Sequence, residues 1–179
     1  HNENSATLTL INTTVSGNTA ELFAGGILQA STGAVTLTNS TVTANQAQAA
    51  NGAGGGISAL AGPVNLTSTL IAKNTAATGD DLHDNDGGGV FNTLGNNLIG
   101  ISNGASGLTH GTRGDIVGTS GSPVDPLLGV LADNGGLTLT HALSAGSPAI
   151  DAGSSTVALD QRGLPRSMDG DGDLVSTPD

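Results

Sequence analysis

The sequence has 179 residues, among them 29 glycines, two phenylalanines and no tryptophan, tyrosine or cysteine, which excludes an interior built on aromatic rings or disulfides. Only 11% of the residues are charged, and 15 acidic residues against four Lys and Arg give a net charge of -11. This balance excludes nucleic acid as a partner, because neutralising phosphates needs clustered basic residues, and it opposes adsorption to anionic membranes.

The first hundred residues contain a repeat. Three segments align without gaps and begin at Leu8, Val35 and Val64, which are 27 and 29 residues apart. In each segment two aliphatic residues flank a polar one, and another aliphatic residue follows seven positions after the first. Because side chains alternate between the two faces of a strand, this pattern predicts a strand with one buried face, followed by a second short strand.

A glycine cluster and an aliphatic residue come after each segment, at Gly25-Gly26-Ile27, Gly54-Gly55-Gly56-Ile57 and Gly87-Gly88-Gly89-Val90. The glycines allow a turn, and the aliphatic residue predicts a third short strand. Three short strands within each repeat of 27 or 29 residues are typical of one coil of a parallel β-helix.

We therefore predict an all-β fold, a right-handed parallel β-helix of about three to five coils, in residues 1–100. Its interior should be a column of aliphatic side chains in which Leu10, Leu37 and Leu66 lie above one another. We expect little helix, because no stretch carries 3.6-residue apolar periodicity over ten or more positions.

Three asparagines, Asn18, Asn45 and Asn74, hold the same place in each unit, just after the second strand. Identical side chains stacked in register form amide ladders along the stacking axis. We predict that these asparagines form a structural ladder at a corner of the coil. The alternative is a polar row that binds a ligand.

After residue 100 the repeat gives way to a region rich in Gly, Ser and Thr with distinctive motifs. The motifs span residues 96–100, 114–118, 125–129, 131–136, 139–143, 146–153 and 160–166. Together they resemble the choice-of-anchor Q domain, which lies at the C-terminal end of large exported β-helix proteins. The resemblance implies that residues 101–179 form an irregular, loop-rich cap packed on the helix end. It also implies a bacterial protein that is exported, held at the cell surface or released, and without assigned enzymatic activity.

Two acidic clusters are candidate calcium sites. Asp169, Asp171 and Asp173 alternate with glycine, so their carboxylates can converge on one hard cation, with Asp179 as a later ligand. The match to an EF-hand loop is incomplete, because Leu174 stands where glycine is expected. The second cluster consists of Asp80, Asp81, Asp84 and Asp86. A solvated acidic segment is the alternative for both clusters.

Enzymatic β-helices are the competing class of function. A lyase needs a basic side chain as the proton acceptor. The basic residues of this chain are Lys73, Arg113, Arg162 and Arg166. We expect Lys73 to point to solvent and the last two arginines to pair with Asp151 or Asp160. A hydrolase needs two carboxylates across a groove, and here no Trp or Tyr offers a platform for sugar. We therefore predict no catalytic residue.

The sequence thus favours a non-enzymatic structural or adhesive scaffold, extracellular or on the bacterial cell surface. The N-terminal edge near Ala6 to Leu10 would be an open strand edge, which templates further pairing. We expect it to meet preceding coils of the same precursor, a second copy in a homo-oligomer, or another surface protein. The alternatives are a carbohydrate-binding or polysaccharide-degrading β-helix with glycan partners, and an ice-binding face of outward threonines. We expect no membrane insertion by this segment, because no apolar run approaches the ~20 residues that a spanning helix needs.

Overall fold

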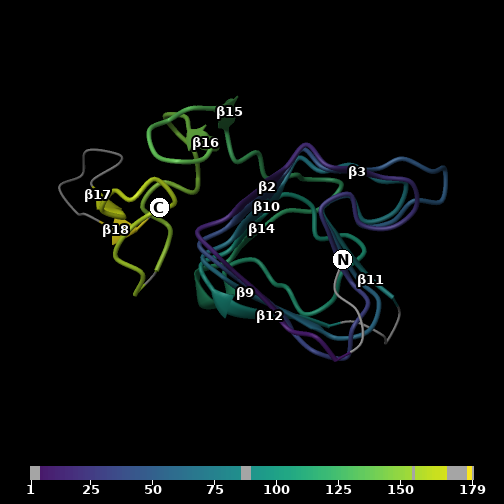
Figure 1. The fold of residues 1–179 in the computed structure, drawn as a ribbon. Coiled ribbons are helices and arrows are strands. Elements are labelled where there is room, and N and C mark those ends of the chain that lie inside the picture. Colours follow the sequence, from purple (N-terminus) through teal and green to yellow (C-terminus); the bar gives the residue numbers. More distant parts are fainter. Residues whose placement is uncertain (1–4, 86–89, 155, 169–176, 179) are drawn as a thin grey trace.

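The computed structural model describes residues 5–85, 90–154, 156–168 and 177–178. Among these residues there is no α-helix, and the regular structure is β apart from a 3-10 turn at Thr112–Gly114. It follows that no described helix is long and apolar enough to span a bilayer. Parallel strands stack into a β-solenoid of about three turns (Figure 1), so the predicted parallel β-helix is confirmed.

Three stacks of parallel strands form the walls of the solenoid. The first wall contains β1 (Leu8–Ile11), β5 (Val35–Thr38), β9 (Pro63–Thr67) and β12 (Val90–Gly95) in that order. The second wall contains β2 (Thr14–Ser16), β6 (Thr41–Thr43), β10 (Leu70–Ala72), β13 (Leu98–Ile99) and β14 (Ile116–Val117). The third wall contains β4 (Ile27–Gln29), β8 (Ile57–Ala59) and β11 (Leu82–Asp84). Beside them β3 (Thr19–Ala20) pairs with β7 (Gln46–Ala47).

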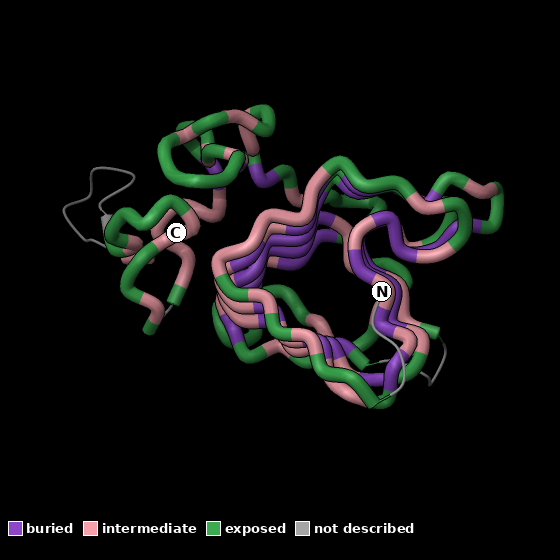
Figure 2. The backbone as a smooth tube through the Cα atoms, viewed as in Figure 1, coloured by how far each residue is buried: buried purple, intermediate pink, exposed green. Residues whose placement is uncertain are grey.

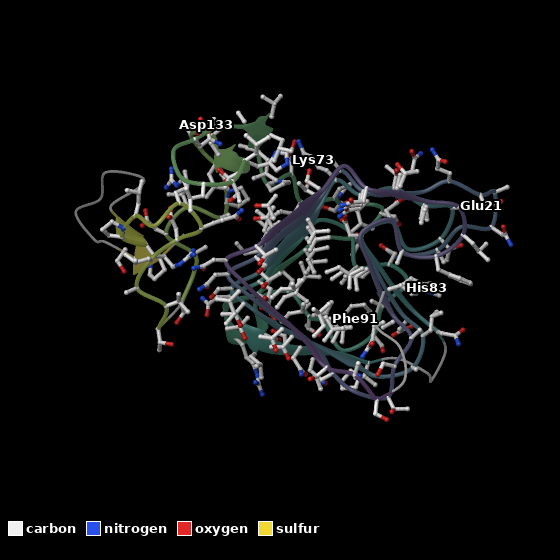
Figure 3. All side chains as sticks on the ribbon, viewed as in Figure 1. Glu21, Lys73, His83, Phe91 and Asp133 are labelled. Carbon is white, nitrogen blue, oxygen red and sulfur yellow. The ribbon has the colours of Figure 1, made fainter. Side chains whose placement is uncertain are left out.

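The interior is one column of stacked side chains, aliphatic apart from Phe91 (Figure 3). In the first wall Leu10 pairs with Leu37, and Leu37 pairs with Leu66, as the sequence predicts. The last two are fully buried. Burying one such side chain stabilises the fold by about 1.5–3 kcal/mol relative to leaving it exposed. The equivalent first inward residues of the four strands of the first wall are Leu8, Val35, Val64 and Phe91. The last of these points into the interior (Figure 3).

The third glycine cluster does not lead into the third wall, so that part of the sequence interpretation is wrong. Val90 begins β12 in the first wall, where Phe91 pairs with Val64. The third-wall strand of this coil is β11, in which Leu82 pairs with Ile57. The cluster at residues 87–89 lies outside the described residues. Asp80 and Asp81 of the third coil occupy the positions of Gly55 and Gly56 in the second coil. The sequence therefore does not show that β11 is equivalent to β8.

The corner between the first and second walls, called the first corner, depends on left-handed backbone. Asn12, Asn39, Ser68 and Asn96 have φ angles of 51, 49, 44 and 57°. Asparagine adopts this conformation more readily than most residues because its short polar side chain bonds locally. The repeated Asn or Ser therefore turns every coil at the same point and leaves a row of polar side chains along this corner.

The C-terminal region has two parts. Residues 101–111 cover the last coil, where Ala105 and Leu108 pack against the core column. Residues 119–168, called the arm, leave the stack and run back along the outer face of the second wall (Figure 2). The arm holds an antiparallel pair, β15 (Leu128–Ala132) and β16 (Thr140–Leu143). At its end β17 (Ser167–Met168) pairs with β18 (Thr177–Pro178). Residues 101–111 thus pack on the end of the solenoid, whereas the arm lies along its side.

Candidate functional site

The three asparagines Asn18, Asn45 and Asn74 form a hydrogen-bonded row at the second corner, after the second wall. The Oδ1 of Asn45 accepts from the Nδ2 and backbone N of Asn18 at 2.9 and 3.0 Å. The Oδ1 of Asn74 accepts from the same two groups of Asn45 at 2.9 and 3.0 Å. Each side-chain amide in the row therefore accepts hydrogen bonds from the preceding coil and donates one to the following coil. All hydrogen bonds of the row thus point the same way along the solenoid axis.

The row ends at Asp81, which is 1% exposed. Its Oδ1 accepts from the backbone N and Nδ2 of Asn74 at 3.0 and 2.9 Å, and its Oδ2 accepts from the backbone N of Ile101 at 2.7 Å. Burial raises the pKa of Asp81 to about 6, although these hydrogen bonds favour the carboxylate. An ionised carboxylate accepts hydrogen bonds but donates none, so the row cannot continue past this residue.

A second row follows the first corner, and sequence reasoning missed it. The backbone N of Thr69 donates to Asn97 Oδ1 at 3.0 Å. The backbone N and Nδ2 of Asn97 donate to Asp115 Oδ1 at 2.8 and 3.0 Å, and Thr93 Oγ1 donates to Asp115 Oδ2. Asp115 is buried. In the sequence, a polar residue follows each residue with left-handed backbone at the first corner. The type of this polar residue changes from coil to coil, so the row could not be recognised as a repeat. Both rows therefore end on a buried aspartate at the same end of the stack.

At the opposite end of the stack, β1 is the outermost strand among the described residues. Within the described residues β1 pairs with β5 on one side only. Leu8, Leu10 and Val15 are half-buried, whereas the equivalent residues of the second coil are fully buried. Asn18, the first member of the asparagine row, is exposed. The two ends of the stack therefore differ in burial and in hydrogen-bonding capacity.

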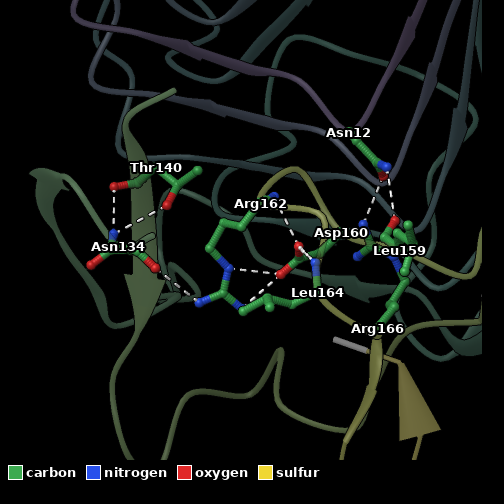
Figure 4. A network of polar contacts seen from close by, with 8 residues as sticks. All are labelled: Asn12, Asn134, Thr140, Leu159, Asp160, Arg162, Leu164 and Arg166. Carbon is green, nitrogen blue, oxygen red and sulfur yellow. Dashed lines mark hydrogen bonds and ion pairs between the residues drawn. The ribbon is translucent and has the colours of Figure 1, made fainter. Parts of the chain in front are cut away.

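Polar side chains of the first corner hold the arm (Figure 4). Arg166 Nη2 donates to Asn12 Oδ1 at 2.7 Å, and Asn12 Nδ2 donates to the backbone O of Leu159 at 2.9 Å. Ser68 Oγ donates to the backbone O of Ser154 at 2.7 Å. The Nδ2 of Asn96 donates to the backbone O of Ala152 at 2.9 Å. The corner row thus both turns the coils and anchors the arm.

An apolar contact fixes the other part of the arm. Leu70, Ala72 and Leu98 are buried although they face outward from the second wall. They form a second hydrophobic cluster with Ile116, Val124, Leu128, Leu143 and Ala149. The sequence signal was available, because β10 and β13 are apolar at consecutive positions, which is typical of strands buried on both faces. In β2 and β6 the outward positions are Thr or Ser, and in β2 these side chains make polar contacts with the arm.

Between the second wall and the arm lies a cavity of about 380 Å³, called the cleft. The wall contributes one outward residue from each strand, in register: Thr14, Thr41, Leu70, Leu98 and Ile116. Side chains of the arm close the other side, including Asn134, His141, Gln161, Arg162 and Arg166. Figure 4 shows the arginines of this side with their partners.

The basic residues make specific contacts. Lys73 is exposed, in line with the expectation that it points to solvent, and its Nζ lies 2.9 Å from Oδ1 of the exposed Asp125. This contact holds the pKa of Asp125 below its ordinary value. Arg162 pairs with Asp160 at 2.6 Å, as predicted. Although burial acts to raise it, hydrogen bonds from Leu164 and Arg162 hold the pKa of Asp160 below its ordinary value.

The carboxylates of the second acidic cluster have separate partners. Asp80 accepts from the backbone N of Ala76 at 3.0 Å, and Asp84 accepts from the backbone N and Oγ of Ser106 at 2.7 and 2.6 Å. Asp81 ends the asparagine row. In the described ranges, no three His, Cys, Asp or Glu side chains are grouped as metal ligands. Asp86, Asp169, Asp171, Asp173 and Asp179 lie outside the described residues. Calcium binding there stays a prediction.

The outer face of the first wall carries an uncharged polar row. Thr9 pairs with Thr36, and Thr36 with Asn65. Asn65 Nδ2 donates to Thr36 Oγ1 at 3.4 Å, and Asn92 Nδ2 donates to Asn65 Oδ1 at 3.0 Å. The threonine array considered for ice binding therefore becomes an asparagine row in the third and fourth coils.

No protein-family profile, curated protein or solved structure matches this chain.

Proposed function

We propose that this chain is the C-terminal, capped end of a longer β-solenoid rod that acts outside the cell as a non-enzymatic structural or adhesive scaffold. The observation that carries the proposal is the difference between the two ends of the stack. At one end both polar rows stop at buried aspartates, and residues 101–111 cover the core column. At the other end a strand edge, half-buried aliphatic side chains and an exposed asparagine are presented.

The open end fits a further coil of the same repeat. Such a coil would pair with β1 as β1 pairs with β5, and would bury Leu8, Leu10 and Val15 as the second coil buries its equivalents. Its corner asparagine would donate to Asn18 Oδ1, because every member of the row accepts from the coil before it. Unsatisfied strand edges favour this kind of addition, and solenoids grow by it.

The occupant we propose is a preceding coil of the same polypeptide. The capped end of a second copy is a poor substitute, because the asparagine row ends there on Asp81, and an ionised carboxylate has no hydrogen to donate to Asn18. Residues 101–111 would also have to leave the core column before two copies could stack head to tail. The resemblance to the choice-of-anchor Q domain supports the same placement, at the C-terminal end of an exported β-helix protein.

The contacts of the charged side chains support a role without catalysis. Lys73 and Arg162 are ion-paired with Asp125 and Asp160. The buried carboxylates Asp81 and Asp115 are engaged in the polar rows. A proton acceptor for a lyase needs a side chain that is free to meet its substrate.

A tandem duplication tests the proposal. Repeating residues 8–34 once, directly before Leu8, adds one coil in register, because Ala34 already leads into the equivalent Val35. We expect the longer chain to unfold in one transition at a higher urea midpoint than the original, since nearest-neighbour contacts add to solenoid stability. The matched control carries the same duplication with Leu10→Asn and Val15→Asn in the added copy. A separate unfolding transition of the added coil, or an unchanged midpoint, would contradict the proposal.

A further inference from the structure

We propose that the cleft between the second wall and the arm binds a single-chain carboxylate, a small molecule with an aliphatic tail and an anionic head. The cleft has a volume of about 380 Å³. Pockets for small molecules commonly measure roughly 300 to 1,000 Å³ and combine an apolar lining with a few polar groups. This binding activity is independent of the scaffold role, because it uses the side of the solenoid and not its open end.

The solenoid side of the cleft changes character along the axis. Its five in-register residues run from Thr14 and Thr41 in the first two coils to Leu70, Leu98 and Ile116 in the later strands. The wall therefore offers hydroxyl groups at one end of the cleft and methyl groups at the other. A ligand with a uniform surface would match only one of these ends.

The arm side changes in the same direction. Leu128 and Leu143 pack in the cluster that contains Leu70 and Leu98, at the apolar end. At the polar end Thr14 Oγ1 donates to Gln161 Oε1 at 2.8 Å, and Ser16 Oγ lies 2.8 Å from His141 Nε2. The two sides of the cleft thus meet in apolar contacts at one end and in hydrogen bonds at the other, so aliphatic groups bound the cavity at one end and polar groups bound it at the other. This arrangement fits an elongated amphiphile that lies along the solenoid axis.

Charge identifies the head group. The chain has only four Lys and Arg and a net charge of -11, yet Arg162 and Arg166 both line the cleft, and Asp160 is the one carboxylate among the described residues that line it. Guanidinium groups bind carboxylates through charge-assisted hydrogen bonds. Arg162 keeps Nε and Nη2 on Asp160, while its Nη1 makes only a long contact of 3.5 Å with the backbone O of Asn134. A ligand carboxylate would replace that weak contact with a stronger one.

Titration of the full chain with octanoate, followed by calorimetry, tests the proposal. We expect saturable binding of octanoate, and binding at least about tenfold weaker for acetate, which lacks the tail, and for octanol, which lacks the charge. Absence of saturable octanoate binding would overturn the proposal, and so would equal binding of octanoate and acetate.

Two variants locate the site. Thr41→Phe places a ring in the middle of the cleft without touching the core column, because Thr41 faces outward. We expect it to abolish octanoate binding while circular dichroism and the unfolding midpoint keep their original values. The matched control, Thr38→Phe, puts the same ring on the outer face of the first wall in the same coil and should bind octanoate normally. Arg162→Gln should weaken octanoate about tenfold or more and leave octanol unchanged. Equal octanoate affinities for the Thr41 and Thr38 variants would contradict the assignment to this cleft.

Discussion

The solenoid stack and the arm are stabilised in different ways. In the stack the strand pairs and the asparagine row recur at the repeat spacing: Asn18 binds Asn45 across 27 residues, and Asn45 binds Asn74 across 29. The contacts that hold the arm to the stack occur once each and join distant residues, such as Thr14 with Gln161 across 147 positions. The stack is therefore a cooperative column in which one defect affects the neighbouring coils, whereas the arm is held by a few replaceable contacts. Mutations in the two regions should differ in magnitude and in reach.

The largest effect is expected in the core column. Leu37→Ala removes a fully buried side chain between Leu10 and Leu66, and should lower the free energy of unfolding by about 2–5 kcal/mol. Urea denaturation measures the loss. In the arm Leu131→Ala serves as a control of the same chemistry, since that leucine is 41% exposed and should change stability little. Equal losses for the two variants would remove the distinction between stack and arm.

Asp81 should make the stack more stable at acid pH. Its pKa is raised from 3.8 to about 6 in the folded chain, so the folded chain holds this proton more tightly than the unfolded chain. The contribution is fully present below pH 3.8 and is lost as the pH rises through 6. Relative to Asp81→Asn, the wild type should lose up to about 3 kcal/mol between these pH values.

Urea midpoints of both proteins across this pH range check the sign. Asp125 and Asp160 titrate in both proteins, so the difference between the two curves isolates Asp81. A wild type that gains stability over Asp81→Asn as the pH rises would show that the carboxylate is favoured in the folded chain.

The asparagine row should show a smaller effect that depends on position. Asn45→Ala leaves the backbone N of Asn18 without its side-chain acceptor and should cost about 1–3 kcal/mol, because Asn45 is buried and bonded on both sides. Asn18→Ala is the matched variant at the exposed end of the same row and should cost less. Thermal unfolding of both proteins measures the gradient, and equal costs would mean that the row is not cooperative.

The smallest effect is expected where the first corner holds the arm. Ser68→Ala removes the hydrogen bonds to Ser154 and should change global stability by about 1 kcal/mol or less, because these groups are exposed. Limited proteolysis should nevertheless cut the arm faster while the stack resists. Thr67→Ala, on the neighbouring outward position of the first wall, is the control. Simultaneous digestion of stack and arm would contradict their independence.

The stack could be predicted from sequence because its physics is local and repeated. Strand alternation placed Leu10, Leu37 and Leu66 in one column, and the shared position of the asparagines brought them into one row. The error at Val90 arose where Asp80 and Asp81 replace the glycines of the coil before. Aligning the repeats by their glycine clusters therefore selected the next cluster along the chain. The strand register is set instead by which residues are buried in the interior.

The arm and the cleft could not be predicted in the same way. The consecutive apolar residues of β10 and β13 predict that both faces of these strands are buried. Burial of the outer face requires another segment to cover it. Nothing local indicates which later segment does so, because the partners of Asn12, Ser68 and Asn96 are mostly backbone carbonyls of the arm. Asp81 was predicted to be a metal ligand because other aspartates lie close to it in the sequence. In the structure it lies next to Asn74 and ends the asparagine row.

Amide hydrogen exchange tests the central claim, the open N-terminal edge, most directly. Leu8 and Asn12 donate to the second coil, and alternate residues of a parallel strand direct their N–H groups to opposite neighbours, so Thr9 and Ile11 face the edge. In the original chain these two amides should exchange quickly. In the chain with residues 8–34 duplicated, the same amides of the second copy should exchange as slowly as those of Thr36 and Thr38 do. Fast exchange there, with the added coil present, would contradict the claim that this edge accepts another coil of the same repeat.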